Sequence, residues 1–231
     1  MSALCDLSAR FREATMPAQG RDLKNETAIA NLSPCPLDTS TWSDFAALVE
    51  RHNGVWGGCW CLEFHPEGAE RSAKRREKKQ CRVREGTAHA ALVYDGSTCV
   101  GWCQFGSPAE LPRIKHQRAY RDGLERLPDW RITCLFVDKA YRGKGVSAAA
   151  LSGALREIAL LGGGTVESYP EDPSGRSVSS SFLYNGSLSI FEKHGFARVR
   201  RVGKNHWVVM KAVEASPTVQ RRDARELLLP A

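Results

Sequence analysis

The chain of 231 residues contains no long apolar run, and its first residues lack the basic and then apolar pattern of a secretory signal. A membrane-spanning helix needs about 20 mostly apolar residues, so the first absence argues against a membrane protein. The second absence leads us to expect a cytoplasmic location. Hydrophobic residues make up 42% of the chain and charged residues 26%, which is ordinary for a soluble globular protein.

The motifs of several common binding sites are also missing. The phosphate-binding pattern Gly-x4-Gly-Lys-Ser/Thr is absent, and the dinucleotide pattern Gly-x-Gly-x-x-Gly is incomplete because Ala148 occupies its third glycine position. The sequence has no helix-turn-helix or zinc-finger spacing and no internal repeat. These absences argue against P-loop proteins, dinucleotide-binding enzymes and the common DNA-binding modules.

A protein without a secretory signal keeps its cysteines reduced, so the eight cysteines do not predict disulfides. The Cys-x-Cys pattern within residues 55–64 fits zinc poorly, because zinc sites use wider pairs and no second pair is present. We therefore predict no metal and interpret this segment as packing or a pocket wall, with aromatic surface from Trp56 and Trp60. The zinc alternative would use Cys59, Cys61, His65 and Cys81.

The formal charge is +7 and the isoelectric point is about 9.1, which favours anionic partners in general. Nucleic acid, a phosphorylated cofactor and an acidic substrate all satisfy this charge. The most basic segment, residues 69–85, is expected to be a helix with a solvated face, and it is also suited to flank a cofactor or attract an acidic substrate. Nucleic acid is the third choice, because the segment has no interleaved aromatic residues.

Hydrophobic periodicity predicts a mixed α/β chain around one central sheet. Residues 1–36 are interpreted as a leader or accessory segment, 37–213 as the domain and 214–231 as a tail. Helices are expected at 42–52, 69–85, 146–161 and 181–194, with a short helix inside 108–130. Strands are expected at 88–93, 99–105, 132–137, 165–169, 197–202 and 206–213, and residues 55–64 form a bent strand or a loop.

The turn at residues 141–147 joins an apolar strand to a helix and has the features of a phosphate site. A helix N-terminus offers unpaired backbone N–H groups and the positive end of the helix dipole, which together bind phosphate. Gly143 and Gly145 let the backbone approach an anion, and Arg142 and Lys144 add positive charge. The same Gly-x-Gly pattern also occurs in ordinary tight turns, so the motif alone leaves both interpretations open.

The segment 134–146 resembles the acetyl-coenzyme A signature of the GCN5-related N-acetyltransferase (GNAT) superfamily, in which a strand precedes Arg/Gln-x-x-Gly-x-Gly/Ala at the start of a helix. Arg142 and Gly145 match this signature, and Ser147 stands where glycine or alanine is usual. Residues 189–196 resemble the family's late Tyr-Glu-Lys-x-Gly-Phe motif. The resemblance covers residues 37–213, and the Trp-Gly-Gly-Cys-Trp-Cys segment is similar to a poorly characterised bacterial branch.

This resemblance implies an α/β (α+β) fold with a mixed, mainly antiparallel central sheet flanked by helices. It also implies an N-acetyltransferase that moves an acetyl group from acetyl-coenzyme A to a primary amine of a small molecule or protein. Backbone N–H groups of the turn would hold the pyrophosphate, and the strand before it would pair with the pantetheine and polarise the thioester. The implied cofactor residues are Leu135, Phe136, Val137, Arg142, Gly143, Lys144, Gly145, Val146, Ser147 and Ala148.

Glu167 is our first choice for the general base, because some relatives carry a catalytic glutamate on the strand that follows the cofactor helix. A carboxylate with a raised pKa, or one that acts through water, suits the deprotonation of an amine. The alternative is that Glu167 is an exposed strand residue or the partner of a nearby arginine. Less favoured bases are Glu63, Tyr169 and Glu171.

Relatives often have tyrosine where this chain has Phe191, and phenylalanine cannot protonate the leaving thiolate. Tyr184 lies about two helical turns earlier on the expected 181–194 helix and would share the same face. We take Tyr184 as the candidate acid; the alternatives are that Tyr184 lines the pocket or packs, and that water protonates the thiolate.

Two other functions stay open. A non-catalytic acyl-coenzyme A-binding or regulatory protein is favoured by Phe191, and a nucleic-acid-binding protein would use the basic segment 69–85. The sequence does not identify the amine acceptor, although the net positive charge argues against a strongly cationic one. A homodimer is expected only because such dimers are the commonest oligomers.

Overall fold

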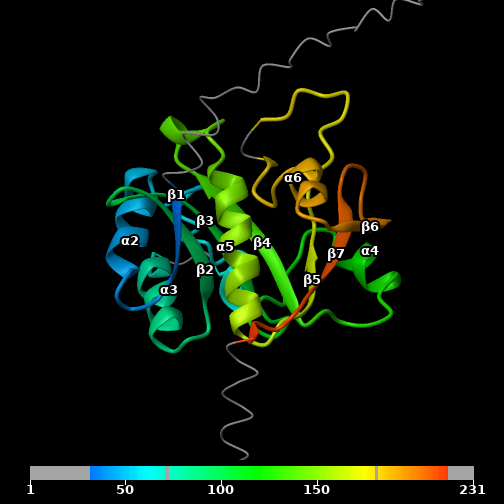
Figure 1. Ribbon diagram of the computed structural model, residues 1–231, viewed down its shortest axis with the longest axis horizontal. Helices are drawn as coiled ribbons and strands as arrows, with labels where there is room; N and C mark the ends of the chain where they lie inside the picture. The colour runs from blue at the N-terminus through cyan, green and yellow to red at the C-terminus, as the bar shows by residue number, and fades with distance from the viewer. Residues whose placement is uncertain (1–31, 71–72, 180–181, 218–231) are drawn as a thin grey trace, which may run out of the picture.

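The computed structural model describes residues 32–70, 73–179 and 182–217, and its centre is a seven-stranded sheet (Figure 1). The strand order is β1-β2-β3-β4-β5-β7-β6, and all neighbours are antiparallel except β4 and β5. The strands are β1 (Leu32–Pro36), β2 (His89–Asp95), β3 (Thr98–Gly106), β4 (Trp130–Val137), β5 (Gly164–Ser168), β6 (Ala197–Arg201) and β7 (Trp207–Val213). The prediction of a mixed, mainly antiparallel sheet flanked by helices is confirmed.

Five α-helices and two short 3-10 helices connect the described strands. They are α2 (Trp42–Arg51), α3 (Arg75–Arg84), α4 (Gln117–Asp122), α5 (Val146–Leu160), α6 (Leu188–Lys193), η1 (Pro66–Ala69) and η2 (Lys139–Tyr141). None of these helices is long and apolar enough to cross a membrane.

The two faces of the sheet carry separate hydrophobic cores, because successive side chains of a strand point to opposite faces. On one face, Phe45 of α2 packs with Trp102 of β3 and Phe136 of β4. On the other face, Leu151 of α5 shares a core with Ala91 of β2. Helix α5 therefore crosses one face of the sheet, as Figure 1 shows, while α2 covers the opposite face.

Two glycines let α5 approach the sheet closely. A side chain at Gly101 of β3 would meet the Phe136 carbonyl oxygen and the Val146 side chain, each at 2.7 Å. A side chain at Gly153 of α5 would meet Pro34 Cβ of β1 at 2.7 Å. These close contacts hold the first turn of α5 beside the end of β4, where the site described below is formed.

Most predicted elements occur where the sequence placed them. The helices expected at 42–52 and 146–161 are α2 and α5, and the hairpin around the Asp95-Gly96 turn is formed by β2 and β3. The basic helix is shorter than expected, because α3 begins at Arg75; Arg71 lies outside the described residues.

Two local predictions differ from the structure, and one open alternative is decided by it. Residues 32–36, which we placed in the leader, form the edge strand β1 and pair with β2, so the sheet begins ahead of residue 37; a short strand with two prolines carries no clear periodic signal. Residues 55–64 form turns, which agrees with the loop alternative and not with the bent strand. The helix expected at 181–194 is α6, which starts only at Leu188, so Tyr184 precedes it and does not share its face; Ser181 lies outside the described residues.

We expect Gly153→Ala to lower the free energy of unfolding by about 1–3 kcal/mol, because the new methyl group would overlap Pro34 and Ala91. Alanine is otherwise the better helix former by about 1 kcal/mol, so without close packing Gly153→Ala would raise the free energy of unfolding. A lower free energy of unfolding therefore indicates close packing at this position. Urea denaturation measures the effect, with the exposed Ser152→Ala on the same helix as the control. A Gly153→Ala protein as stable as the wild type would contradict the close packing of α5 on β1 and β2.

Candidate functional site

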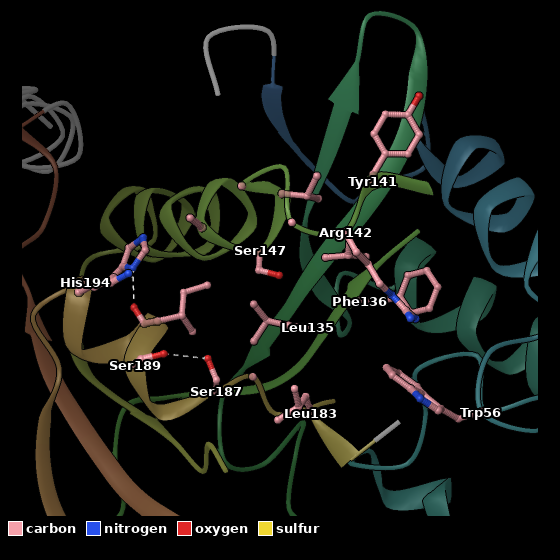
Figure 2. A pocket seen from close by; sticks show the side chains of 18 residues that line it. Trp56, Leu135, Phe136, Tyr141, Arg142, Ser147, Leu183, Ser187, Ser189 and His194 are labelled. Atoms are coloured by element: carbon pink, nitrogen blue, oxygen red, sulfur yellow. Dashed lines mark hydrogen bonds between the residues drawn. The ribbon is translucent and has the colours of Figure 1, made fainter. Parts of the chain in front are cut away.

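One pocket, called the principal pocket because the turn at residues 141–147 lines it, has a volume of about 530 Å³ and lies where β4 ends and α5 begins (Figure 2). One wall comes from β4 and the turn that follows it, and the other comes from α6 and the residues before it. Trp56 closes one end from the loop after α2. The lining is Trp56, Leu135, Phe136, Val137, Tyr141, Arg142, Gly143, Gly145, Val146, Ser147, Ala148, Leu183, Gly186, Ser187, Ser189, Ile190, Lys193 and His194.

The start of α5 presents unpaired backbone donors to this pocket. Gly145 is the N-cap with a φ of 85°, and Gly143 has a φ of 74°, both in the left-handed region that glycine adopts at little cost. The Ala149 N–H donates to the Gly145 carbonyl at 3.0 Å, so the N–H groups of the first helical residues before it have no partner within the helix. Together with the helix dipole and Arg142, they make a site suited to an anion such as pyrophosphate.

Asp138 fixes the turn that precedes α5. Its carboxylate accepts from the Ala140 N–H at 3.0 Å and from Arg51 Nη2 at 3.1 Å, and His52 Nε2 lies 3.1 Å away. Partial burial works against ionisation, but the Ala140, His52 and Arg51 contacts outweigh it and lower the pKa of Asp138. The carboxylate therefore ties α2 to the strand end from which the anion site is built.

The parallel pairing of β4 and β5 is short and leaves one edge of β4 for other partners. The register joins three pairs, of which the last is Ile132 with Ser168. Beyond it, the Leu135 N–H donates to the Tyr184 carbonyl at 2.7 Å, and Asn185 Nδ2 donates to the Thr133 carbonyl at 3.0 Å.

Strand alternation sends every second N–H to the same edge of a strand, so the N–H of Val137 faces the same side as that of Leu135. Val137 also lines the pocket. Its N–H is therefore placed to meet a ligand there, whereas that of Leu135 is already bonded to Tyr184.

A second pocket, of about 270 Å³, adjoins the first at Trp56. Aromatic rings, thiols and one carboxylate line it: Trp56, Cys59, Cys61, Glu63, Phe64, Cys134 and Tyr184. The Trp56 ring lies edge-on to Phe136 at 5.6 Å and to Tyr184 at 6.1 Å. Trp56 therefore stands between the pocket at the helix start and the pocket that holds the thiols.

The loop that carries Trp56 is held in an unfavourable backbone conformation. Val55, Trp56 and Cys61 have φ values of 56°, 43° and 52°, in the left-handed region that residues other than glycine rarely adopt. Hydrogen bonds within the loop, such as Trp60 N–H to the Gly54 carbonyl at 3.1 Å, oppose this strain. Strained backbone of this kind concentrates at functional sites.

All the cofactor residues predicted from the sequence line the principal pocket except Lys144. The Lys144 ammonium instead lies 4.9 Å from the centre of the Tyr141 ring. The structure thus brings the strand end, the turn and the helix start together around one cavity. That these residues bind a cofactor stays a prediction.

Glu167 lies in a different environment from the one that a pocket-lining base would have. It is 3% exposed, accepts from the Tyr120 hydroxyl at 2.8 Å and from the Tyr169 hydroxyl at 3.3 Å, and lines neither pocket described above. Burial raises the pKa of Glu167, while Tyr120 and the charge of Arg131 oppose this effect. A catalytic role for Glu167 would therefore require proton transfer through the tyrosines or a rearrangement.

Tyr184 and Phe191 lie in different surroundings, although the sequence analysis placed them on one face of the same helix. Tyr184 lines the second pocket, and burial, with a contribution from the charge of Glu171, raises its pKa. Phe191 is fully buried in the α5 core and lies edge-on to Phe196, with ring centres 5.1 Å apart. The tyrosine at the site is therefore held by the turn before α6 and not by α6 itself.

The α6 side of the principal pocket was missed in the sequence. Its polar lining residues are Ser187, Ser189, Lys193 and His194. Asn185, which donates to β4, was also missed, because the helix expected at 181–194 included it. The Asn185-Gly186 pair is a turn signal, and Gly186 has a φ of 80°, so this pair was the available sign that the helix begins later.

The zinc alternative finds no support in the geometry. Among the described residues, no three side chains of histidine, cysteine, aspartate or glutamate are grouped so that they could hold a metal ion. Cys81 instead donates to Glu85 Oε1 at 3.0 Å, on the exposed side of α3.

Residues 47–173 match the model of the acetyltransferase (GNAT) family. The match spans more than half of the chain, so the protein belongs to this family, as the sequence motifs predicted. Members are acetyltransferases and generally use acetyl-coenzyme A as the co-substrate. No curated protein sequence matches the chain.

Solved structures similar to this one include a protein described as histone acetyltransferase HPA2 and related acetyltransferase from Corynebacterium glutamicum, with 19% identity, a TM-score of 0.44, and coverage of 81% of this chain and 99% of that chain. An N-acetyltransferase from Staphylococcus aureus has 12% identity, a TM-score of 0.45, and coverage of 80% and 98%. An acetyltransferase from Thermus thermophilus has 14% identity, a TM-score of 0.43, and coverage of 79% and 97%. At these values the similarities carry no argument about substrate or mechanism.

We expect Tyr120→Phe to destabilise the protein by about 1–3 kcal/mol at pH 7, because buried Glu167 would lose its donor at 2.8 Å. A carboxyl whose folded pKa is raised weakens the folded state as the pH rises through that pKa. Removing the Tyr120 hydroxyl raises the folded-state pKa of Glu167 further. The loss of stability caused by Tyr120→Phe should therefore shrink as the pH falls toward that pKa.

Urea denaturation between pH 5 and 8 measures this dependence. Tyr94→Phe is the matched control, because its hydroxyl donates to Asp44 at 2.9 Å, away from Glu167. An equal loss for Tyr120→Phe at every pH would contradict the assignment of the effect to Glu167.

Proposed function

We propose that the protein transfers an acetyl group from acetyl-coenzyme A to a primary amine. The observation that carries this proposal is that the open edge of β4 and the unpaired N–H groups of α5 line one pocket. A strand edge binds an extended amide chain, and a helix N-terminus binds phosphate. Coenzyme A has both parts in sequence, a pantetheine arm followed by a pyrophosphate.

The turn before α5 would hold the pyrophosphate. The N–H groups of residues 146–148 carry the dipole's positive end, and Arg142 adds a full charge at the same wall. Gly143 has open space where a Cβ would lie, so its backbone can approach the phosphate oxygens. Ser147, which departs from the family signature, lines the pocket without closing it.

The open edge of β4 would bind the pantetheine arm. Val137 offers its N–H on this edge, and a donor fixed in place before the reaction stabilises the negative charge that develops on the thioester oxygen. Leu135 contributes its side chain to the wall; its N–H is bonded to the Tyr184 carbonyl. The acetyl group would then lie near Trp56, where the two pockets meet.

The second pocket would take the amine. Its aromatic walls favour a cationic group near them, and Glu63 supplies a carboxylate that can accept a proton from the incoming ammonium. Tyr184, whose pKa is raised, stays protonated at neutral pH and would donate a proton to the leaving thiolate. Glu167, the base predicted from the sequence, is the rival of Glu63 for the first of these roles.

We expect Ser147→Asp to weaken acetyl-coenzyme A binding at least tenfold, about 1.4 kcal/mol, because a carboxylate would face the pyrophosphate. An acidic residue in the first turn of a helix does not harm the helix itself, so the fold should persist. Isothermal titration calorimetry measures the binding.

Ser43→Asp is the charge-matched control, since Ser43 is exposed in the first turn of α2 and lies outside the pocket. If both variants bind as the wild type does, the start of α5 is not the phosphate site. Absence of binding by the wild type would overturn the cofactor proposal as a whole.

The base and the acid are tested by thiol release from acetyl-coenzyme A with a panel of amines. Glu63→Gln should lower kcat/KM about 100-fold, as removal of a general base does. Tyr184→Phe should lower kcat with little change in KM, because its proton is needed only after the amine has bound.

Glu167→Gln is the matched carboxylate control, and a large loss there with Glu63→Gln unaffected would identify Glu167 as the base. Tight binding of acetyl-coenzyme A without thiol release for any amine would favour a non-catalytic acyl-coenzyme A-binding protein.

A further inference from the structure

Lys79 of α3 is buried without a carboxylate partner among the described residues. It is 1% exposed, and its ammonium donates to Gln104 Oε1 at 2.7 Å and to the Cys61 carbonyl at 3.4 Å. His65 Nε2 lies 3.2 Å away, and burial together with the Lys79 charge lowers the pKa of His65 to about 2. The atoms known to surround this ammonium are therefore uncharged oxygens and a neutral imidazole.

A buried cation costs several kcal/mol unless an anion compensates it. The group placed to do so is the thiol of Cys61, which is 3% exposed and shares this interior with Lys79. Trp102 supports this assignment, because its indole Nε1–H is buried without a hydrogen-bond partner among the described residues. A sulfur anion at Cys61 would accept this N–H and balance the ammonium.

The charges and donors around the Cys61 sulfur favour the thiolate. Burial by itself disfavours the anion, but a hydrogen bond with Cys134, the charge of Lys79 and the Trp102 N–H outweigh it and lower the pKa of Cys61. Burial and the neighbouring Cys61 raise the pKa of Cys134 well above its usual range. These directions favour a thiolate at Cys61 and a protonated thiol at Cys134.

Both cysteines of this pair line one pocket. Cys61 and Cys134 both line the second pocket, which adjoins the principal pocket at Trp56. Cys59 lines the same pocket, but burial raises its pKa, so it serves as an internal comparison. A small molecule that enters the pocket would meet one thiolate and two thiols.

We propose that Cys61 is a modification site for small oxidants that enter the second pocket, its sulfur held as a thiolate by Lys79 and Trp102, with Cys134 as the resolving thiol. Reactive cysteines of this kind combine thiolate character, access and a nearby second cysteine. The site lies in the pocket proposed above for the amine, but the oxidation itself needs neither the α5 turn nor the open edge of β4.

The chemistry needs a two-electron oxidant, for which hydrogen peroxide is the probe. The Cys61 sulfur attacks one peroxide oxygen, the O–O bond breaks and hydroxide leaves, so that Cys61 becomes a sulfenic acid. The Cys134 sulfur then attacks the Cys61 sulfur, an S–S bond forms, and the S–O bond breaks with release of water. The resulting disulfide would join the strained loop to β4 across the second pocket.

The full chain treated with hydrogen peroxide should yield a disulfide between two tryptic peptides, residues 52–71 and 132–139. Mass spectrometry without reduction detects this pair. Cys61→Ala should abolish it, whereas Cys59→Ala, in the same peptide and the same pocket, should leave it intact. Cys134→Ala should leave a sulfenic acid at Cys61 that dimedone traps. Loss of the cross-link in Cys59→Ala but not in Cys61→Ala would overturn the assignment.

Alkylation by iodoacetamide tests the thiolate without any substitution. In the wild type at pH 7, Cys61 should react at least tenfold faster than Cys59, and its rate should level off at a lower pH than that of an ordinary thiol, whose pKa is about 8.5. Lys79→Met removes the charge while keeping the volume and should slow Cys61 roughly tenfold. If Cys61 reacts no faster than Cys59 in the wild type, the proposal fails, whether or not Lys79→Met folds.

Discussion

The structure depends on the early end of the parallel pairing between β4 and β5. After Ile132 the edge of β4 no longer bonds to β5, and a backbone edge inside a protein needs other partners. Tyr184 and Asn185 supply some of them, and the rest of the edge faces the principal pocket. The position of α5, held against the sheet by the absence of side chains at two glycines, then sets where a helix dipole meets that edge.

The loop between α2 and η1 joins the two pockets through a single side chain. Trp56 contacts Phe136 on one side and Tyr184 on the other, so the rings at the end of β4 and the segment before α6 are packed around it. The same loop carries Cys61 to the buried Lys79. A strained backbone and the aromatic ring between the two pockets therefore occur within one short loop, which also contacts the buried Lys79 of α3.

Local signals in the sequence were sufficient to predict the strand, turn and helix at 132–161, because apolar runs, glycines and helix starts depend on residues that are adjacent in the chain. Contacts between distant segments could not be read in this way. β1 has little periodicity and is defined by pairing with β2. The burial of Glu167 depends on Tyr120, which is far away in the chain. The helix expected to carry Tyr184 was overextended because the Asn185-Gly186 turn was given too little weight.

The edge strand β1 also bears on how copies of the chain can associate. Pro34 and Pro36 have no N–H to offer, and at the opposite edge β6 carries Arg198, Arg200 and Arg201. Proline and clustered positive charge both discourage the addition of a further strand. The sheet is therefore protected at both borders against growth by edge-to-edge stacking, and self-association would have to use the helical surfaces or the loops.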